Sequence, residues 1–350
     1  MVSTTSHTTG GLDIVFFCNP LLDISVDDHD GSLSEKYKLQ HGQACLAGEE
    51  HMPLFEEIFH REGRLLIPGG SGLNSARACG YCFNKQSPGK GVVGYVGCIG
   101  KDERGKALSE AVAADGVKAF FQEEQDHKTG ACAVVVKEKE RALCAYLGAS
   151  AKYAISHLND NSEKIYQANY IYATGFFITS NAEALRQVAK HCADNDKPFG
   201  FNISAAFVVD FYFDDVKFAL EHADFVFCNE DEADAYGKKH DIAPGNREET
   251  AKVIASLPKA NGRRARHVII TQGKEPVIVA SKHPDSEVTV TSVELTPIDR
   301  SLIVDTNGCG DSFVGAFFAA NIQGHDVIDC VKAGNALAGI VITKNGCTFE

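Results

Sequence analysis

The sequence predicts an α/β protein with a central, mostly parallel sheet that is flanked by helices. From residue 168 onward, short apolar runs alternate with helical stretches, which favours right-handed βαβ crossovers and parallel strands. Glycine-rich turns at 69–72 and 308–310 stand directly before predicted helices. A chain of 350 residues with 44% hydrophobic side chains can bury the large core that such a sheet requires.

The first half of the chain is expected to supply strands to this sheet and also a separate hairpin. The apolar runs 13–18 and 92–97 predict buried strands. Residues 132–137 and 141–147 flank a short charged turn, a pattern that is typical of a β-hairpin. Helices are expected at 49–59, after the glycines at 69–72, and at 105–115.

The second half is expected to alternate strands and helices to its end. Strands are predicted at 169–174, 199–203, 224–228, 267–271 and 287–295. Helices are predicted from 181 and at 214–222, 229–239, 309–323 and 327–342. Residues 301–304 are apolar and rich in β-branched side chains, so we expect a strand that leads into the helix at 309.

Charge and cysteine content disfavour several classes of protein. A formal net charge of -13 disfavours nucleic acid or an anionic membrane as the main partner. No apolar run reaches 18 residues, and residues 1–11 lack the apolar core of a signal peptide. The 12 cysteines are scattered, which indicates free thiols in a reducing compartment. We therefore expect a cytoplasmic protein. The basic run 263–266 is typical of a solvated loop; as a nuclear-import signal, the alternative, it would permit a nuclear pool.

The segment Asp305-Thr306-Asn307-Gly308-Cys309-Gly310-Asp311 carries the strongest chemical signal. Glycines at a helix start let the backbone approach a ligand, and the first N–H groups of the helix attract an anion. We therefore predict an anion hole formed by the backbone N–H groups of Gly308, Cys309 and Gly310. Asp311 could cap the helix, but Asn307 or Ser312 can supply that cap. Asp311 is therefore interpreted as a base that takes a proton from an attacking hydroxyl.

Polar and aromatic residues follow other predicted strands. Ligands of open α/β sheets bind beyond the carboxyl ends of the strands, so Asn19 and Asp23 are candidate binding residues, although an aspartate after a proline is commonly a turn residue. Asn229-Glu230-Asp231-Glu232 begins a helix, where acids complement the helix dipole. Three rings near strand ends are either core residues or surfaces on which a flat heterocycle stacks: Phe176, Phe177 and Phe207.

These segments resemble the signatures of the ribokinase-like (PfkB) carbohydrate kinases. The resemblance runs from Asp13 to Phe349 and includes Gly69-Gly70-Ser71-Gly72-Leu73-Asn74 and the segment 305–311, in which Cys309 stands where the family usually has Ala or Gly. It implies a ribokinase-like, Rossmann-like three-layer sandwich with a small discontinuous α/β lid. The large domain would comprise 1–22, 66–126 and 149–350, and the lid would comprise 23–65 and 127–148.

The resemblance also implies phosphoryl transfer from ATP with Mg²⁺. Within the family the motifs are most similar to those of members that phosphorylate the 5′-hydroxyl of adenosine to give AMP in purine salvage. The implied catalytic residues are Asp311, the backbone of 308–310 and Arg141, a lid residue that is otherwise interpreted as an exposed strand residue. Glu232 would hold Mg²⁺ through water. The implied ATP contacts are Asn229, Thr271, Gly273 and Asn335, the last of which is often His in the family.

The implied adenosine site has a polar part and an apolar part. Asp23 would hold the ribose hydroxyls, supported by Asn19, Gly70 and Asn74. Further implied substrate contacts are Gly69, Ser71 and Asn202. The apolar slot for adenine would be formed by Leu46, Cys132, Leu143, Ala145, Phe177 and Phe207.

Two other functions stay open. A kinase of the same fold for a free sugar or another nucleoside would share these motifs, but the apolar lid residues disfavour a free sugar. A nucleoside-binding protein without catalysis would keep the pocket and lose the base, which the presence of Asp311 and both glycines disfavours. The charged hairpin and the resemblance favour a monomer, and the net charge disfavours nucleic acid and membrane as partners.

Overall fold

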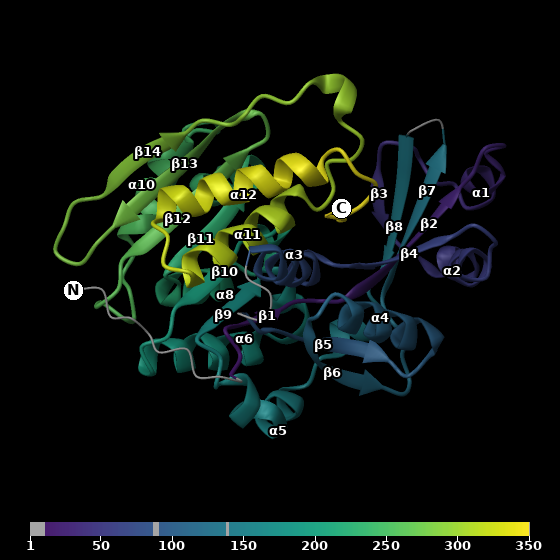
Figure 1. The fold of residues 1–350 in the computed structure, drawn as a ribbon, viewed down its shortest axis with the longest axis horizontal. Coiled ribbons are helices and arrows are strands. Elements are labelled where there is room, and N and C mark those ends of the chain that lie inside the picture. The colour runs from purple at the N-terminus through teal and green to yellow at the C-terminus, as the bar shows by residue number, and fades with distance from the viewer. Residues whose placement is uncertain (1–10, 87–90, 138–139, 350) are drawn as a thin grey trace.

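The larger of two sheets has nine strands in the order β14-β13-β12-β11-β10-β9-β1-β5-β6 (Figure 1). The computed structural model describes residues 11–86, 91–137 and 140–349. Pairing is parallel from β12 to β6, and β13 and β14 at one edge pair antiparallel. The predicted, mostly parallel sheet is therefore confirmed. The strands are β1 Ile14–Phe17, β5 Val93–Gly100, β6 Lys118–Glu124, β9 Tyr170–Thr174, β10 Phe199–Asn202, β11 Phe225–Asn229, β12 Arg266–Gln272, β13 Glu275–Lys282 and β14 Thr289–Val293.

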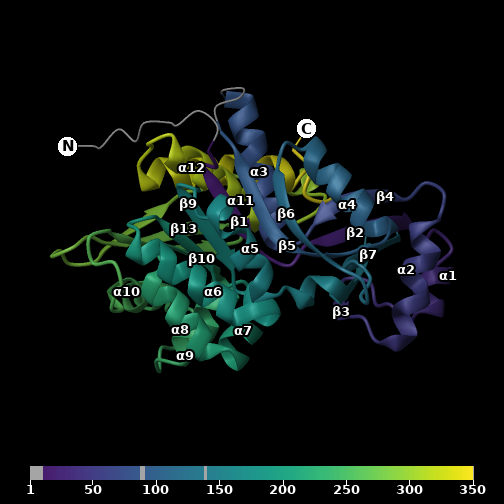
Figure 2. The same ribbon diagram turned by 90° about the horizontal axis from the view of Figure 1, so that it is seen from below.

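Helices cover both faces of this sheet, which gives the three layers seen in Figure 2. Successive side chains of a strand point to opposite faces. In β1, Ile14 and Phe16 accordingly join one buried cluster, and Val15 and Phe17 join the other. The first face carries α3 Ser71–Gln86, α11 Cys309–Ile322 and α12 Val327–Val341. The second carries α5 Ile155–Ile165, α6 Phe176–Asp194, α7 Ala206–Phe211, α8 Phe213–His222, α9 Glu230–Lys238 and α10 Arg247–Ser256.

The smaller sheet has five strands in the order β3-β8-β7-β2-β4 and stands beside the larger one (Figure 1). Its β7 and β8 pair antiparallel, which confirms the predicted hairpin, although the turn at 138–139 lies outside the described residues. The strands are β2 Leu21–Asp27, β3 Ala44–Leu46, β4 Leu65–Gly69, β7 Ala131–Lys137 and β8 Glu140–Tyr146. The helices near it are α1 Ser32–Lys36, η1 Glu49–His51, α2 Met52–Phe59 and α4 Glu103–Ala114.

The expected strand at 301–304 is wrong. Residues Arg300–Leu302 form a short 3₁₀ helix, η3, and the backbone that follows does not join a sheet. The N–H groups of Val304 and Asp305 instead donate to the carbonyl of Ile342, just after α12. The apolar side chains of this segment are largely exposed. Because β-propensity mainly reflects packing against a buried sheet face, these side chains do not stabilise a strand here.

Two further features concern helices. α6 contains a break at Asn181, whose Oδ1 accepts the N–H of Ala184 at 2.8 Å, so a helix does start at the predicted residue. Within the residues that the structure describes, no helix combines the length and the apolar character needed to cross a membrane.

Candidate active site

The carboxylate of Asp311 lies in the first turn of α11 and is held by two side chains of α3. Ser71 Oγ donates to Oδ1 at 2.7 Å, and Asn74 Nδ2 donates to Oδ2 at 3.0 Å. The two helices can approach closely because Gly315 has no side chain: a Cβ there would lie 2.4 Å from the carbonyl oxygen of Ser75. Both carboxylate oxygens are thus occupied by side chains of another helix.

The start of α11 is bare of capping side chains. Its N-cap is Gly308, and no side chain among the described residues accepts a capping hydrogen bond there, so neither Asn307 nor Ser312 supplies the cap that either could have formed. Ser312 Oγ donates instead to the carbonyl of Cys309 at 2.9 Å. The first N–H groups of a helix have no partner inside it, and that of Cys309 is 3.4 Å from the carbonyl of Thr306. This helix start is therefore available to an anion.

The two glycines of this turn differ in their surroundings. Gly308 has a φ of 76°, and a Cβ there would lie 2.7 Å from Cβ of Cys347. At Gly310 a Cβ would meet no heavy atom of the described residues within 4 Å, so this space is open to a ligand. Burial raises the pKa of the Cys309 thiol to about 12, which keeps the thiol neutral beside the anion site.

A first cavity, cavity A, of about 360 Å³ lies between the smaller sheet and the segment 305–311. Its polar wall includes Asp23, Asn74 and Asp311, and its apolar wall includes Cys132, Val134 and Leu143. The Oδ1 atom of Asn74 is buried and has no hydrogen-bond partner in the described part of the chain, so it is available to a ligand.

Asp23 is the second carboxylate of cavity A. Gly69 makes room for it, because a Cβ at residue 69 would lie 2.4 Å from its carboxylate atoms. Burial raises the pKa of Asp23 to about 7; Arg77 lowers this pKa, and the charges of Asp311 and Asp305 raise it. Burial also raises the pKa of Asp311, and the hydrogen bonds from Asn74 and Ser71 oppose that rise.

Two more cavities continue from cavity A past the start of α11. Cavity B, about 290 Å³, collects residues at the carboxyl ends of three neighbouring strands together with α11: Asn202, Asn229, Thr271, Gly310 and Asp311. Cavity C, about 650 Å³, is lined by residues that include Thr271, Gly273, Leu295, Gly310, Asn335 and Ile342. Asp311 is thus common to cavities A and B, and Gly310 is common to cavities B and C.

Asn229 and Glu232 form a reciprocal helix cap at the wall of cavity B. The N–H of Glu232 donates to Asn229 Oδ1 at 2.9 Å, and the N–H of Asn229 donates to Glu232 Oε2 at 3.1 Å. Burial raises the pKa of Glu232 to about 7, against the hydrogen bonds from the backbone of Asn229 and Ser204. The bonds to the cap fix this carboxylate beside Asp311.

Arg141 is not an exposed strand residue. From β8 it forms an ion pair with the buried Asp305 and donates to Asn345 Oδ1 at 2.8 Å. Asp305 also accepts the N–H groups of Asn307 at 3.0 Å and of Gly346 at 2.9 Å. One carboxylate therefore ties the smaller sheet to the segment that carries Asp311.

One residue predicted for the site lies in the core, and for others a contact with a ligand stays a prediction. Phe177 is fully buried and packs against Phe17 and Tyr153, so its ring belongs to the core, whereas its neighbour Phe176 lines cavity B. Asn19 is buried; its Nδ2 donates to Thr179 Oγ1 at 3.4 Å, and its Oδ1 has no hydrogen-bond partner in the described part of the chain, so a ligand contact of Asn19 stays a prediction. Contacts of Leu46, Ala145 and Phe207 with a ligand stay predictions; Leu46 is 71% exposed and Phe207 is 45% exposed.

Arg77, which was not among the predicted site residues, supports cavity A from α3. Its Nη1 donates to the carbonyl of Pro68 at 2.8 Å and to that of Cys347 at 3.2 Å, and the guanidinium pairs with Asp115. It thus joins the strand that precedes the first glycine motif to the C-terminal loop. A charged residue within the apolar face of a predicted helix was the signal that could have identified it.

Comparison with known proteins places the chain in a class. A model of the pfkB family carbohydrate kinases matches residues 55–350. The chain therefore belongs to this family and is a phosphotransferase.

Three adenosine kinases are similar to the chain over nearly its whole length. Adenosine kinase 2 of Arabidopsis thaliana is 37% identical over 333 residues, which cover 95% of this chain and 94% of that protein. The structure of Anopheles gambiae adenosine kinase in complex with P1,P4-di(adenosine-5) tetraphosphate has 36% identity and a TM-score of 0.83, covering 96% of this chain and 97% of that one. Schistosoma mansoni adenosine kinase in complex with adenosine has 34% identity and a TM-score of 0.84, with 97% of each chain covered.

Proposed function

We propose that this protein transfers the γ-phosphoryl group of ATP to the 5′-hydroxyl of adenosine, giving AMP and ADP. One observation carries the proposal: Asp311 lies where cavities A and B meet, and Gly310 lies where cavities B and C meet. An acceptor in cavity A and a phosphate donor in cavity C would thus meet at a carboxylate and a helix N-terminus. Phosphoryl transfer needs this positioning and charge stabilisation more than covalent chemistry.

Asp311 is the proposed base. The hydrogen bonds from Ser71 and Asn74 fix its orientation and favour its ionised form. The carboxylate would take the proton of the 5′-hydroxyl while that oxygen bonds to the γ-phosphorus. The bond between the γ-phosphorus and the bridging oxygen breaks at the same time, and ADP leaves.

The N-terminus of α11 is the proposed anion hole. Charge spreads over the oxygens of the transferring group in the transition state. The backbone N–H groups of 308–310 and the positive end of the helix dipole would stabilise that charge. The open space at Gly310 permits the phosphate to reach these donors.

Cavity A fits a nucleoside better than a free sugar. Asp23 can accept hydrogen bonds from two ribose hydroxyls, and the unpartnered Oδ1 of Asn74 can accept another. One part of the wall is apolar, with Cys132, Val134 and Leu143, and suits a flat heterocycle better than a second hydroxyl-rich group. Adenosine has both a ribose with two free ring hydroxyls and a flat heterocycle.

Cavity C is the proposed site of the adenine ring of ATP. Its walls are apolar at Leu295, Ile298 and Ile342. The Nδ2 atom of Asn335 is buried there and has no acceptor in the described part of the chain. A ring nitrogen of adenine is an acceptor of the required kind, so Asn335 would donate to it.

The chemistry of cavity B fits Mg²⁺. Mg²⁺ is usually bound by one or two carboxylates, several waters and substrate phosphates. The buried Glu232, fixed by its cap with Asn229, would hold such an ion through water. When bound, Mg²⁺ would neutralise part of the phosphate charge.

The smaller sheet is the proposed lid, comprising residues 23–65 and 127–148. The ion pair between Arg141 and Asp305 would hold this lid against the catalytic segment. A closed lid excludes water, which limits the hydrolysis of ATP when no acceptor is bound.

The experiment that tests the function is an ADP-release assay with Mg²⁺-ATP and four acceptors in parallel: adenosine, inosine, ribose and fructose. Turnover of adenosine far above the others is expected. Turnover of ribose or fructose at a similar rate would contradict the nucleoside site in cavity A. Binding of adenosine without turnover would contradict the proposed catalysis.

A further inference from the structure

Three potential metal ligands meet on the smaller sheet, away from cavities A, B and C. Cys45 of β3 and Cys144 of β8 are register partners in a parallel pair, so their side chains share one face. His51 ends η1, the turn that follows β3. One ligand atom from each of Cys45, His51 and Cys144 lies within 4.8 Å of the other two.

The spacing of these atoms is close to that of a tetrahedral zinc site. Bonds of about 2.3 Å to sulfur and about 2.0 Å to nitrogen place the ligand atoms about 3.5 to 3.8 Å apart. The ligand atoms lie within 4.8 Å of one another, so each pair would have to approach by at most roughly 1.3 Å. Side-chain rotation at Cys45, which is exposed, and at His51 can supply this movement.

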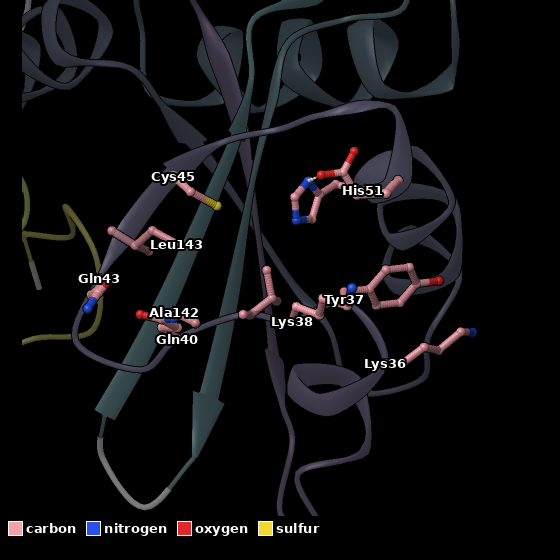
Figure 3. A pocket seen from close by; sticks show the side chains of 11 residues that line it. Lys36, Tyr37, Lys38, Gln40, Gln43, Cys45, His51, Ala142 and Leu143 are labelled. Atoms are coloured by element: carbon pink, nitrogen blue, oxygen red, sulfur yellow. Dashed lines mark ion pairs between the residues drawn. The ribbon is translucent and has the colours of Figure 1, made fainter.

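The cluster is accessible from solvent through a separate cavity of about 610 Å³, which both Cys45 and His51 line. In Figure 3 the Cys45 thiol and the His51 ring point toward each other. The cluster reaches from the surface at Cys45 to the core at Cys144. Glu50 also lines the cavity, and its carboxylate is 3.6 Å from Nδ1 of His51.

We propose that Cys45, His51 and Cys144 bind a thiophilic divalent cation such as Zn²⁺, with the fourth position filled by water or by Glu50. Two thiolates and one imidazole are ligands that zinc prefers. Binding releases one proton from each of the two thiols. The proposal does not depend on the proposed function.

Binding also changes one hydrogen bond of the turn. Nδ1 of His51 accepts the N–H of Gly48 at 3.0 Å. The cation either replaces this donor at Nδ1, or binds Nε2 after the ring proton has moved to Nδ1. In both cases the hydrogen bond from Gly48 is lost, and coordination of His51 by the cation would hold the turn instead.

The site is placed to affect the wall of cavity A. Leu143 lines cavity A and directly precedes Cys144 on β8. A cation would link β3, β8 and η1 through coordinate bonds, and so would stiffen the sheet that forms this wall. We therefore expect bound metal to change the affinity for a ligand of cavity A as well as thermal stability.

The test is a metal titration of the full-length protein under a non-thiol reductant, with Co²⁺ read by its visible and sulfur-to-metal absorption and Zn²⁺ by calorimetry. One equivalent is expected to bind with the spectrum of a tetrahedral thiolate site. Cys45→Ser and His51→Ala should each weaken this binding by roughly 10- to 100-fold or more. Cys45 is exposed, so its substitution should leave the fold intact.

The matched control is Cys82→Ser, which changes a partly exposed cysteine on α3. It should bind the metal as the wild type does. The proposal fails if Cys45→Ser and His51→Ala, shown to be folded by circular dichroism, bind Co²⁺ with unchanged affinity and spectrum. It also fails if Zn²⁺ raises the melting temperature of these variants as much as that of the wild type.

Discussion

Asn74 donates a hydrogen bond of 3.0 Å to Asp311, although the two residues are 237 positions apart. The bond joins the first turn of α3 to the first turn of α11, and Ser71 adds a second bond between the same helices. Because both helix starts follow a glycine-rich turn, each glycine motif sets the position of one partner. The orientation of the proposed base therefore depends on both motifs.

Replacing the proposed base should remove catalysis and preserve binding. Asp311→Asn keeps the size of the side chain but cannot accept the proton, so kcat should fall by roughly 10²- to 10⁴-fold. The Kd of adenosine, measured by calorimetry, should change little. Asp329→Asn, in an exposed acid of α12, is the control and should keep full activity. A kcat within twofold of the wild type would show that Asp311 is not the base.

Removing one bond to this carboxylate should move the pH profile. The hydrogen bond from Ser71 lowers the pKa of Asp311 and so opposes the effect of burial. In Ser71→Ala that pKa should rise, so the acid limb of kcat/KM against pH should move to higher pH. Ser75→Ala, in the same helix turn, removes a hydroxyl that bonds the backbone of Ser71 and should leave the limb in place. Equal profiles for both variants would contradict the role of Ser71.

The sequence was sufficient for features whose chemistry is local in the chain. The two glycine turns, the strand ends and Asp311 are each recognisable in fewer than ten residues, and the alternation of apolar runs sets the parallel sheet. The segment 301–304 has the composition of a strand, but no strand among the described residues pairs with it. Whether a segment finds a pairing strand depends on the whole fold.

The sequence could not predict the surroundings of residues whose contacts form only when distant segments of the chain come together. Phe176 and Phe177 are neighbours, yet the first lines cavity B and the second is in the core, because helical geometry turns them to different sides. The pairing of Arg141 with Asp305 requires the position of the smaller sheet. The cluster of Cys45 and Cys144 requires the register of β3 and β8.

Releasing the proposed lid should weaken substrate retention. Arg141→Ala removes the ion pair with Asp305 and the bond to Asn345, so we expect kcat/KM for adenosine to fall by roughly tenfold or more. The ratio of ATP hydrolysis to adenosine phosphorylation should rise, because water enters the site. Glu140→Ala, at an exposed neighbour on β8, is the control. An unchanged ratio in Arg141→Ala would contradict the lid.

Asp23 should reduce stability at high pH while it supports binding. Its pKa is about 7 in the folded protein and about 3.9 when exposed. Between these values the folded protein binds a proton that the unfolded chain does not, so the free energy of unfolding falls as pH rises from about 3.9 to about 7 and levels off above that. Asp23→Asn should therefore raise the melting temperature by a few degrees at pH 8 and by less at pH 5.

The same variant should lose affinity for adenosine, because an amide is a poorer acceptor for two ribose hydroxyls than a carboxylate. Glu140→Gln changes an exposed acid of the smaller sheet that does not line cavity A and is the control for both measurements. A melting temperature that differs from the wild type equally at pH 5 and pH 8 would exclude the titration of Asp23 as the cause.

Gly310 offers a test of the anion hole that leaves the fold intact. A Cβ at this position meets no heavy atom of the described residues within 4 Å, and alanine is a better helix former than glycine. Gly310→Ala should therefore keep or raise the melting temperature, while its methyl group occupies the space proposed for the phosphate. We expect kcat/KM for ATP to fall by roughly 10²-fold.

Gly262→Ala is the matched control, because its Cβ would also meet open space but lies away from the cavities, and it should keep normal kinetics. Gly308→Ala differs from both: its φ of 76° and the contact of 2.7 Å with Cys347 predict a loss of stability as well as of activity. If Gly310→Ala retained wild-type kcat/KM for ATP at an unchanged melting temperature, the phosphate would have to bind elsewhere, and the N-terminus of α11 would not be the anion hole.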